Sequence, residues 1–319
     1  MKYGFASDRH KEFPPMVVVS IVNVCNLRCV HCYYSKYSKL PGYKRNYMEL
    51  GLWKKIMDEM KQYPWSILNL GTDGEPLLHK QFVEFMRYAR QAGVVPINLT
   101  TNGVLLEGDL AETLVREDLI DVINVSLDAF SPEKYKAIRG GSYERVYRNV
   151  HRIIELRDLH KADTKIQVNI IDQPEVHDEV EDFRAYWEGR ADQVLVRTYY
   201  DATSVTGQTG GNVTGKQKEF EEIKRWPCQQ FWRRFNIGDD GTAHFCVDDW
   251  FKKTRIGDVN KQSIHEIWTG PEYERLRKLH LDGKFCDIDY CSKCTEWQGM
   301  KWDYDYFTAM SKLLGKDLL

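Results

Sequence analysis

Residues 16–32 read MVVVSIVNVCNLRCVHC, an apolar, β-branched run that leads directly into a loop with three cysteines. The run predicts a buried strand. The cysteines are Cys25, Cys29 and Cys32, and their spacing lets one loop place three thiolates around a single iron–sulfur cubane. Three protein ligands leave one iron open, and a small molecule with an amine and a carboxylate can chelate that iron.

A structural zinc site is the alternative for this loop. Such sites usually hold the metal with four closed ligands, and His31 is the fourth donor within the loop. Because His31 directly precedes Cys32 in a tight turn, we favour the iron–sulfur cluster over zinc.

Strand-like segments followed by helix-like segments recur from the N-terminus to Tyr200. The predicted strands are Met16–Val24, Ser66–Leu70, Val95–Thr100, Val122–Leu127, Lys165–Ile171 and Gln193–Tyr199. The predicted amphipathic helices include Leu50–Gln62, Lys80–Ala92, Tyr143–Arg157 and Glu175–Trp187. Such units in series predict a parallel sheet with right-handed crossovers, either doubly wound or forming an incomplete barrel. In both arrangements the ligand site lies at the C-terminal ends of the strands.

The composition of the chain changes after Tyr200. Residues 201–217 are rich in Gly, Thr and Ser, which predicts a linker or a lid. From Pro227 onward the chain contains five cysteines and ends in a predicted helical tail from Trp297 to Leu314. We therefore expect a core at 1–200, a linker or lid at 201–226, and a cysteine-containing domain at 227–319.

Charge and composition exclude several classes of protein. The formal net charge is -2, so no basic excess points to nucleic acid or to an anionic membrane. No apolar run is long enough to span a bilayer, and no signal peptide is recognisable. We expect a cytoplasmic protein, in which eight clustered cysteines bind metal or do chemistry more often than they form disulfides.

The Cys25-x₃-Cys29-x₂-Cys32 signature, placed after the first strand of a βα repeat, resembles the radical S-adenosylmethionine (SAM) superfamily. This resemblance implies an α/β fold, a (β/α)6 partial TIM barrel, with a 4Fe–4S cluster held by the three cysteines and SAM on the open iron. It also implies that a flavodoxin- or ferredoxin-type reductant supplies the electron that cleaves SAM. The resulting 5′-deoxyadenosyl radical abstracts a hydrogen from the substrate.

The resemblance extends to the turn after the second predicted strand. Gly74, Glu75 and Pro76 match the GGEP motif of the family, with Asp73 where the first glycine is common. The family pattern places these three residues along the amine of the SAM methionine. A carboxylate facing an ammonium group makes a charge-assisted hydrogen bond.

Four more SAM contacts are implied by position. Asn102, after the third strand, matches a residue near the SAM ribose, and Ser126, after the fourth, matches a ribose or carboxylate contact. Arg139 resembles the residue that pairs with the SAM carboxylate. His31 occupies a position that is usually aromatic in the family and contacts the adenine.

The second group of cysteines resembles the SPASM/Twitch extension of radical SAM enzymes. The implied ligands of one auxiliary 4Fe–4S cluster are Cys228, Cys246, Cys291 and Cys294. Their layout resembles the 2-deoxy-scyllo-inosamine dehydrogenase family of Twitch enzymes. A zinc knuckle that uses Cys291-x-x-Cys294 is the alternative. Cys286 is left over, either as a buried small residue or alternative ligand, or as a hydrogen-atom donor.

Two reactions are consistent with this pattern. An oxidoreductase would convert a hydroxylated carbon to a ketone and pass an electron to the auxiliary cluster, whereas an epimerase would return a hydrogen atom from a thiol. We favour dehydrogenation. Arg197 and Tyr199, with Tyr200, end the sixth strand, and the first two are the candidate catalytic residues. A buried hydrogen-bonded pair is the alternative for these side chains.

Two features of the sequence bear on the class of substrate. About fifteen residues precede the first strand, which favours a small molecule such as a sugar, nucleotide-sugar or aminocyclitol over a leader peptide. Peptide modification is the second hypothesis. GTP cyclisation is the third, and we discount it because the chain ends in Lys316-Asp317-Leu318-Leu319 where those relatives end in Gly-Gly. A non-catalytic metal-binding protein is disfavoured by the intact cysteine motif and Glu75.

Overall fold

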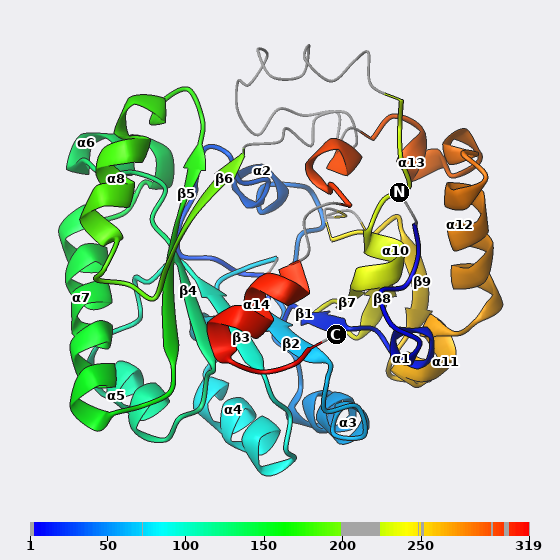
Figure 1. The fold of residues 1–319 in the computed structure, drawn as a ribbon, viewed down its shortest axis with the longest axis horizontal. Coiled ribbons are helices and arrows are strands. Elements are labelled where there is room, and N and C mark those ends of the chain that lie inside the picture. The colour runs from blue at the N-terminus through cyan, green and yellow to red at the C-terminus, as the bar shows by residue number, and fades with distance from the viewer. Residues whose placement is uncertain are drawn as a thin grey trace.

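One nine-stranded sheet runs through the molecule in the order β6-β5-β4-β3-β2-β1-β7-β8-β9 (Figure 1). The computed structural model describes residues 3–71, 73–198, 224–247, 249, 252–294, 296–302 and 306–318. Strands β1 to β7 are paired in parallel, and β8 and β9 continue the sheet in antiparallel fashion. The strands are β1 (Met16–Val19), β2 (Ile67–Leu70), β3 (Ile97–Thr101), β4 (Val122–Ser126), β5 (Lys165–Asp172), β6 (Gln193–Thr198), β7 (Phe235–Ile237), β8 (Thr242–His244) and β9 (Arg255–Asp258).

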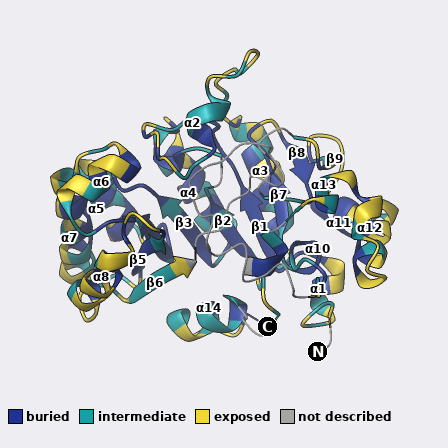
Figure 2. Cartoon of the chain, turned by 90° about the horizontal axis from the view of Figure 1, so that it is seen from above, coloured by how far each residue is buried: buried dark blue, intermediate teal, exposed yellow. Residues whose placement is uncertain are grey.

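The sheet is curved, and helices cover its outer side (Figure 2). The helices of the first segment are α1 (Arg9–Glu12), α2 (Tyr34–Tyr37), α3 (Leu50–Met60), α4 (Phe82–Gln91), α5 (Gly108–Arg116), α6 (Pro132–Arg139), α7 (Tyr143–His160) and α8 (Val180–Trp187). Those of the second are α10 (Gln230–Arg233), α11 (Ile264–Trp268), α12 (Pro271–Leu281), α13 (Asp289–Ser292) and α14 (Tyr306–Leu314). No helix in the described part of the chain is long and apolar enough to cross a membrane.

The two faces of β1 belong to different apolar clusters. Val17 and Val19 lie in the main core under the outer helices. Met16 and Val18 face the inner side and pack against α14 in a second cluster. Successive strand residues point to opposite faces, so this alternation is expected. Helix α14 therefore fills the part of the curved sheet that lies near the N-terminal ends of its strands.

The architecture confirms the predicted partial barrel of parallel strands and corrects several boundaries. The first strand, predicted to reach Val24, ends at Val19, because the chain then turns into the cysteine loop. The predicted tail helix from Trp297 to Leu314 is divided into a 3₁₀ turn at Glu296–Gly299 and α14. Helices α5 and α6 add to the helix ranges given as examples from the sequence. The stretch 201–217 and Tyr199 and Tyr200 lie outside the described residues.

Candidate active site

The three cysteines of the first group lie at the C-terminal ends of the parallel strands, in the loop between β1 and α2. The loop is anchored on α6, because the backbone N–H of Val30 donates to the carbonyl of Ile138 at 2.9 Å. Sγ of Cys29 lies 3.9 Å from the carbonyl oxygen of Arg139. The position of the loop is therefore fixed by the end of the helix that carries Arg139.

Burial controls the chemistry of these thiols. It raises the pKa of Cys25 to about 11 and that of Cys32 to about 12, and it also raises the pKa of Cys29. Thiols in such surroundings stay protonated unless a positive centre compensates the thiolate charge, which bound iron does. Among the described residues, no three His, Cys, Asp or Glu side chains are grouped closely enough to hold a single metal ion.

The turn after β2 packs directly against the chain that leads to Cys25. The backbone N–H of Glu75 donates to the carbonyl of Val24 at 2.8 Å. A Cβ atom on Gly74 would lie 2.4 Å from that same oxygen, a distance that no side chain tolerates. Glycine is therefore required at position 74 for the turn to approach the cysteine loop.

Glu75 is buried and joins the ends of β2 and β3. Its Oε1 accepts from Thr101 Oγ1 at 2.7 Å, and its Oε2 accepts from the backbone N–H of Asn102 at 2.7 Å. Burial raises the pKa of Glu75, while these hydrogen bonds act in the opposite direction. A carboxylate has about four acceptor positions, so the predicted contact with a SAM amine stays compatible with this geometry.

Asn102 reaches back to the cysteine loop. Its Nδ2 donates to Oδ1 of Asn26 at 2.7 Å and lies 3.7 Å from Sγ of Cys25. Asn102 is predicted from the sequence to lie near the SAM ribose, whereas Asn26 has no predicted role. Nothing in the spacing of Asn26 indicated the pairing, because the two asparagines are brought together only by the adjacency of the loop and β3.

A buried charged group lies beside Cys29. Nη1 of Arg139 donates to Oδ2 of Asp128 at 2.5 Å, and Nε2 of His31 is 3.6 Å from the same oxygen. Burial acts to lower the pKa of Arg139, but the adjacent Cys29 and Asp128 outweigh it and the net pKa is raised. Arg139 therefore remains a cation, while burial lowers the pKa of His31.

Asp128 was not predicted to be a site residue, whereas Ser126 of the same segment was. Asp128 is 1% exposed and has a φ of 59°, a conformation that Asp tolerates better than most residues. Its position two residues after β4 was the available signal. Ser126 instead lies on the inner face, where its Oγ accepts from Nδ2 of Asn169 at 3.3 Å.

Arg197 lies on β6, opposite Ile171 of β5. Val194 and Val196 pack against the main core, so alternation places Arg197 on the inner face of the curved sheet. Its side chain is exposed. The predicted catalytic roles of Arg197 and Tyr199 stay predictions, since Tyr199 lies outside the described residues.

Three of the four predicted auxiliary ligands are close neighbours. Burial raises the pKa of Cys291 to about 12 and that of Cys294 to about 11, and it also raises the pKa of Cys228. The charges of Cys291 and Cys294 contribute to the shift at Cys228. Cys246 lies just after β8. Cys286 is exposed, which corrects the expectation that it is a buried small residue.

A cation and a neutral imidazole border this group of thiols. Nη1 of Arg225 donates to the carbonyl of Cys291 at 2.8 Å, and the guanidinium lies 4.3 Å from the ring centroid of Phe285. The positive charge of Arg225 opposes the effect of burial at all three thiols. Nδ1 of His280 accepts from the backbone N–H of Cys228 at 3.2 Å, and burial lowers the pKa of His280 to about 3.

The family model described as the radical SAM superfamily matches residues 19–184. The chain belongs to the radical SAM superfamily. A second model, SPASM, an iron–sulfur cluster-binding domain, matches residues 228–295. Together they imply a 4Fe–4S cluster, SAM and an auxiliary iron–sulfur cluster, which confirms the predicted cofactors.

Sequence relatives are similar over part of the chain. The probable GTP 3′,8-cyclase of Methanocaldococcus jannaschii is 33% identical over 161 residues, which cover 50% of this chain and 52% of that protein. The GTP 3′,8-cyclase of Limosilactobacillus fermentum is 32% identical over 187 residues, covering 56% and 52%. The chain therefore spans about half the length of the curated relatives it matches.

Solved structures share the fold over most of the chain. BtrN in complex with AdoMet and 2-DOIA has a TM-score of 0.58 and 16% identity, covering 95% of this chain and 99% of BtrN. SuiB of Streptococcus suis bound to S-adenosylmethionine has a TM-score of 0.69 and 16% identity, covering 89% and 72%. At these identities the likeness shows the fold alone.

The residues at the strand ends fit the cofactors of the superfamily. Three thiols in one loop, with Cys29 buried and Cys25 and Cys32 half-buried, match the donor set of a cluster with one open iron. Nε of Arg139 and Nδ1 of His31 are buried without a hydrogen-bond partner in the described structure. Because buried polar groups are normally paired, these atoms indicate that a polar ligand belongs beside Cys29.

Proposed function

We propose that this radical SAM protein is an oxidoreductase that converts a hydroxylated carbon of a small substrate, such as a sugar, nucleotide-sugar or aminocyclitol, to a ketone. The observation that carries the proposal is a polar cavity between the two cysteine-bearing regions. The cavity is lined by Asn23, just before the first cysteine loop, and by Cys246 of the second group. A substrate held there would be next to both cluster-binding regions.

We assign the first cluster to Cys25, Cys29 and Cys32, and the auxiliary cluster to Cys228, Cys246, Cys291 and Cys294. The positive charge of Arg139 supports its pairing with the SAM carboxylate. The remaining proposed SAM contacts are His31, Gly74, Glu75, Pro76, Asn102 and Ser126. We also propose that the chain is divided into a core at 1–200, a linker or lid at 201–226 and an auxiliary domain at 227–319.

When bound, SAM and the clusters supply hydrogen-atom abstraction and one-electron transfer. The tasks left to the chain are to exclude water, to hold the hydroxylated carbon and to receive the hydroxyl proton. Overall, the substrate loses one hydrogen atom, one proton and one electron, which together are two hydrogens. Arg197, on the inner face of β6, is proposed to hold the oxygen together with Tyr199.

The reaction is tested by incubating the reconstituted protein with SAM, a chemical reductant and candidate sugars, and by measuring product mass. A loss of two mass units with formation of 5′-deoxyadenosine supports dehydrogenation. Uptake of solvent deuterium without that loss would identify an epimerase. GTP belongs among the test substrates, because the curated relatives are named GTP 3′,8-cyclases. No 5′-deoxyadenosine with any substrate would overturn the proposal.

The ligand assignment predicts the iron content. Reconstituted protein should contain about eight irons, and replacement of Cys25, Cys29 and Cys32 by Ala should leave about four, since one cubane remains. Exposed Cys286→Ala is the matched control and should leave the iron content unchanged. About four irons falling to none, with one zinc retained, would make the second group a structural zinc site and remove the proposed electron acceptor.

A further inference from the structure

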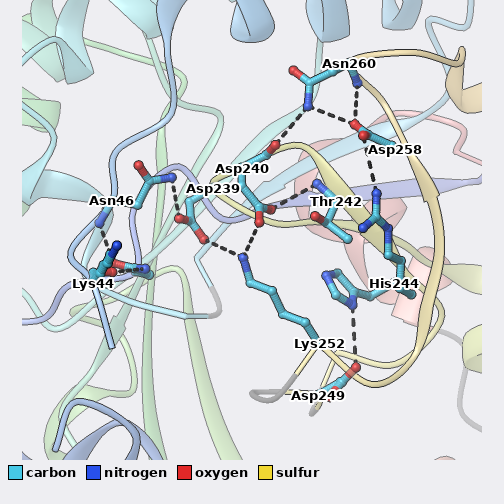
Figure 3. A network of polar contacts seen from close by, with 12 residues as sticks. Lys44, Asn46, Asp239, Asp240, Thr242, His244, Asp249, Lys252, Asp258 and Asn260 are labelled. Carbon is cyan, nitrogen blue, oxygen red and sulfur yellow. Dashed lines mark hydrogen bonds and ion pairs between the residues drawn. The ribbon is translucent and has the colours of Figure 1, made fainter. Parts of the chain in front are cut away.

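A small cavity, open to solvent, lies at the C-terminal ends of β1, β2 and β7. One wall contains Ser20 after β1 and Asp73 after β2, and the opposite wall comes from the β7–β8 hairpin and the segment that follows it. Figure 3 shows the polar network of that opposite wall, including Asp239, His244 and Lys252.

The cavity is lined by more negative than positive groups. Among the described residues of the lining, the carboxylates of Asp73, Asp239 and Asp249 outnumber the one ammonium group, that of Lys252. Lys252 is chiefly engaged with Asp240, because its Nζ lies 2.6 Å from Oδ2 of Asp240 and 3.6 Å from Oδ1 of Asp239. The negative charge at Asp73 and Asp239 is therefore only partly compensated.

Three buried acceptor atoms in this lining have no hydrogen-bond donor among the described residues. One is Oδ1 of Asp249, and the other two are Oδ1 of Asn236 and Oδ1 of Asp239. Asn236 and Asp239 are both more than nine-tenths buried. Their other polar atoms are used, since Nδ2 of Asn236 donates to the carbonyl of His244 at 3.1 Å and Oδ2 of Asp239 accepts from Asn46 at 2.7 Å.

Leaving a buried acceptor unpaired costs about 1–3 kcal/mol, so such atoms are rare unless a ligand completes them. The carboxyl of Asp73 supplies a further acceptor on the facing wall. Burial, and next the charge of Asp239, raise the pKa of Asp73 to about 6, while Ser20, His244 and Lys252 act in the opposite direction. At neutral pH the carboxylate is therefore ionised but lacks a full counter-charge.

We propose that this cavity binds a protonated amine of the substrate through Asp73, Asn236 and Asp239. An ammonium group has three N–H donors and no acceptor, which matches three acceptor atoms with a net negative charge. A neutral hydroxyl in the same place would satisfy fewer acceptors and would leave the charge unbalanced. The inference rests on the proposed function for its placement of the substrate, and it narrows the substrate class to amine-bearing molecules.

The test measures equilibrium binding of matched sugars to the reconstituted protein with SAM at pH 7. The probes are glucosamine, galactosamine and mannosamine, each beside glucose, galactose or mannose, which carry a hydroxyl in place of the amine. We expect at least one amino sugar to bind at least tenfold more tightly than its partner. Asp73→Asn and Asp239→Asn should each reduce that preference about tenfold or more. Two variants are tested so that the experiment remains informative if one of them misfolds.

The control is Asp258→Asn, which removes the same charge from the same module outside the cavity and should retain the preference. Equal binding within all three sugar pairs, or a preference unaffected by both cavity variants, would overturn the inference. Binding does not require SAM cleavage, so the two proposals fail separately. Absence of 5′-deoxyadenosine would contradict the proposed function, whereas oxidation of sugars without an amine preference would contradict this inference alone.

Discussion

Gly74 shows how one missing side chain sets the geometry of the site. A methyl group there would lie 2.4 Å from the carbonyl oxygen of Val24. That oxygen is a backbone atom, so it cannot move aside without a shift of the main chain. Gly74→Ala should therefore lower the stability by about 2 kcal/mol or more and reduce the iron bound to the first cysteine group. Anaerobic thermal unfolding and iron analysis measure both effects.

The matched control is Gly51→Ala. Gly51 lies in the first turn of α3, is exposed, and has open space where a Cβ would be added. Alanine favours the helix over glycine by up to about 1 kcal/mol, so this variant should be neutral or slightly stabilised. Equal losses in the two variants would mean that the backbone contact at Gly74 has no special role.

Asp73 predicts a pH dependence of stability. Because its folded pKa is raised from 3.8 to about 6, the native state binds a proton more tightly than the unfolded state, and stability falls as pH rises from about 4 to about 6. The groups facing it are Ser20, Asp239, His244 and Lys252. Asp73→Asn should remove this slope and raise the free energy of unfolding at pH 7.5 by about 1–2 kcal/mol. Denaturant titrations across this pH range would contradict the expectation if the wild-type and variant slopes were equal.

At the residue scale, the sequence predicted those site residues that lie close together in the chain. The first cysteine group and the glycine-containing turn were recognisable because their members are close in the chain. Asn26 and Asp128 were not, because each acquires its partner only when separate strand ends become adjacent. The same holds for Asn236 and Asp239, whose oxygens without a hydrogen-bond donor are recognisable only in the folded cavity.

At the scale of elements, the positive charge on the segment before α10 should tune the auxiliary site. Arg225 lies among Cys228, Cys291 and Cys294, and a cation stabilises the reduced, more negative form of a cluster. Arg225→Gln should lower the midpoint potential of the auxiliary cluster by about 30–60 mV. For a one-electron couple, 59 mV corresponds to a tenfold change in the equilibrium constant.

The charge-preserving Arg225→Lys is the matched variant for this prediction. The midpoint potential of the auxiliary cluster in this variant should stay close to the wild-type value, because the positive charge remains even though the stacking on Phe285 is lost. Potentiometric titration followed by electron paramagnetic resonance separates this electrostatic effect from loss of the cluster. A similar drop in both variants would instead indicate a packing role for the guanidinium.

The elements that the sequence predicted best are those with strong periodicity. The strands β2 to β6 and the helices α3, α4 and α7 lie within a few residues of their predicted bounds. The three-residue strands β7 and β8 are too short to show a period. Helix α14 is partly buried on the inner face, which could not be foreseen from its own residues.

At the scale of the whole molecule, the sheet is continuous between the two cysteine-bearing segments. Val17, Val18 and Val19 of β1 pair with Phe235, Asn236 and Ile237 of β7. A chain truncated after Thr198 would leave the apolar β1 as an unpaired edge and would uncover Met16 and Val18 by removing α14. We expect the truncated chain to aggregate. Soluble yield and size-exclusion chromatography, compared with those of the full chain, measure this aggregation. A stable monomer that binds one cubane would contradict this.

The pairing of β1 with β7 also bears on the speed of electron transfer. The loop with Cys25 and the hairpin before Cys246 begin from adjacent strands of one hydrogen-bonded ladder. Tunnelling rates fall steeply with the distance between donor and acceptor, and a hinge between two separate domains would let that distance fluctuate. In the proposed reaction an electron passes to the auxiliary cluster, and the β1–β7 ladder would hold the two strands that lead to the cluster-binding regions in one register during that transfer.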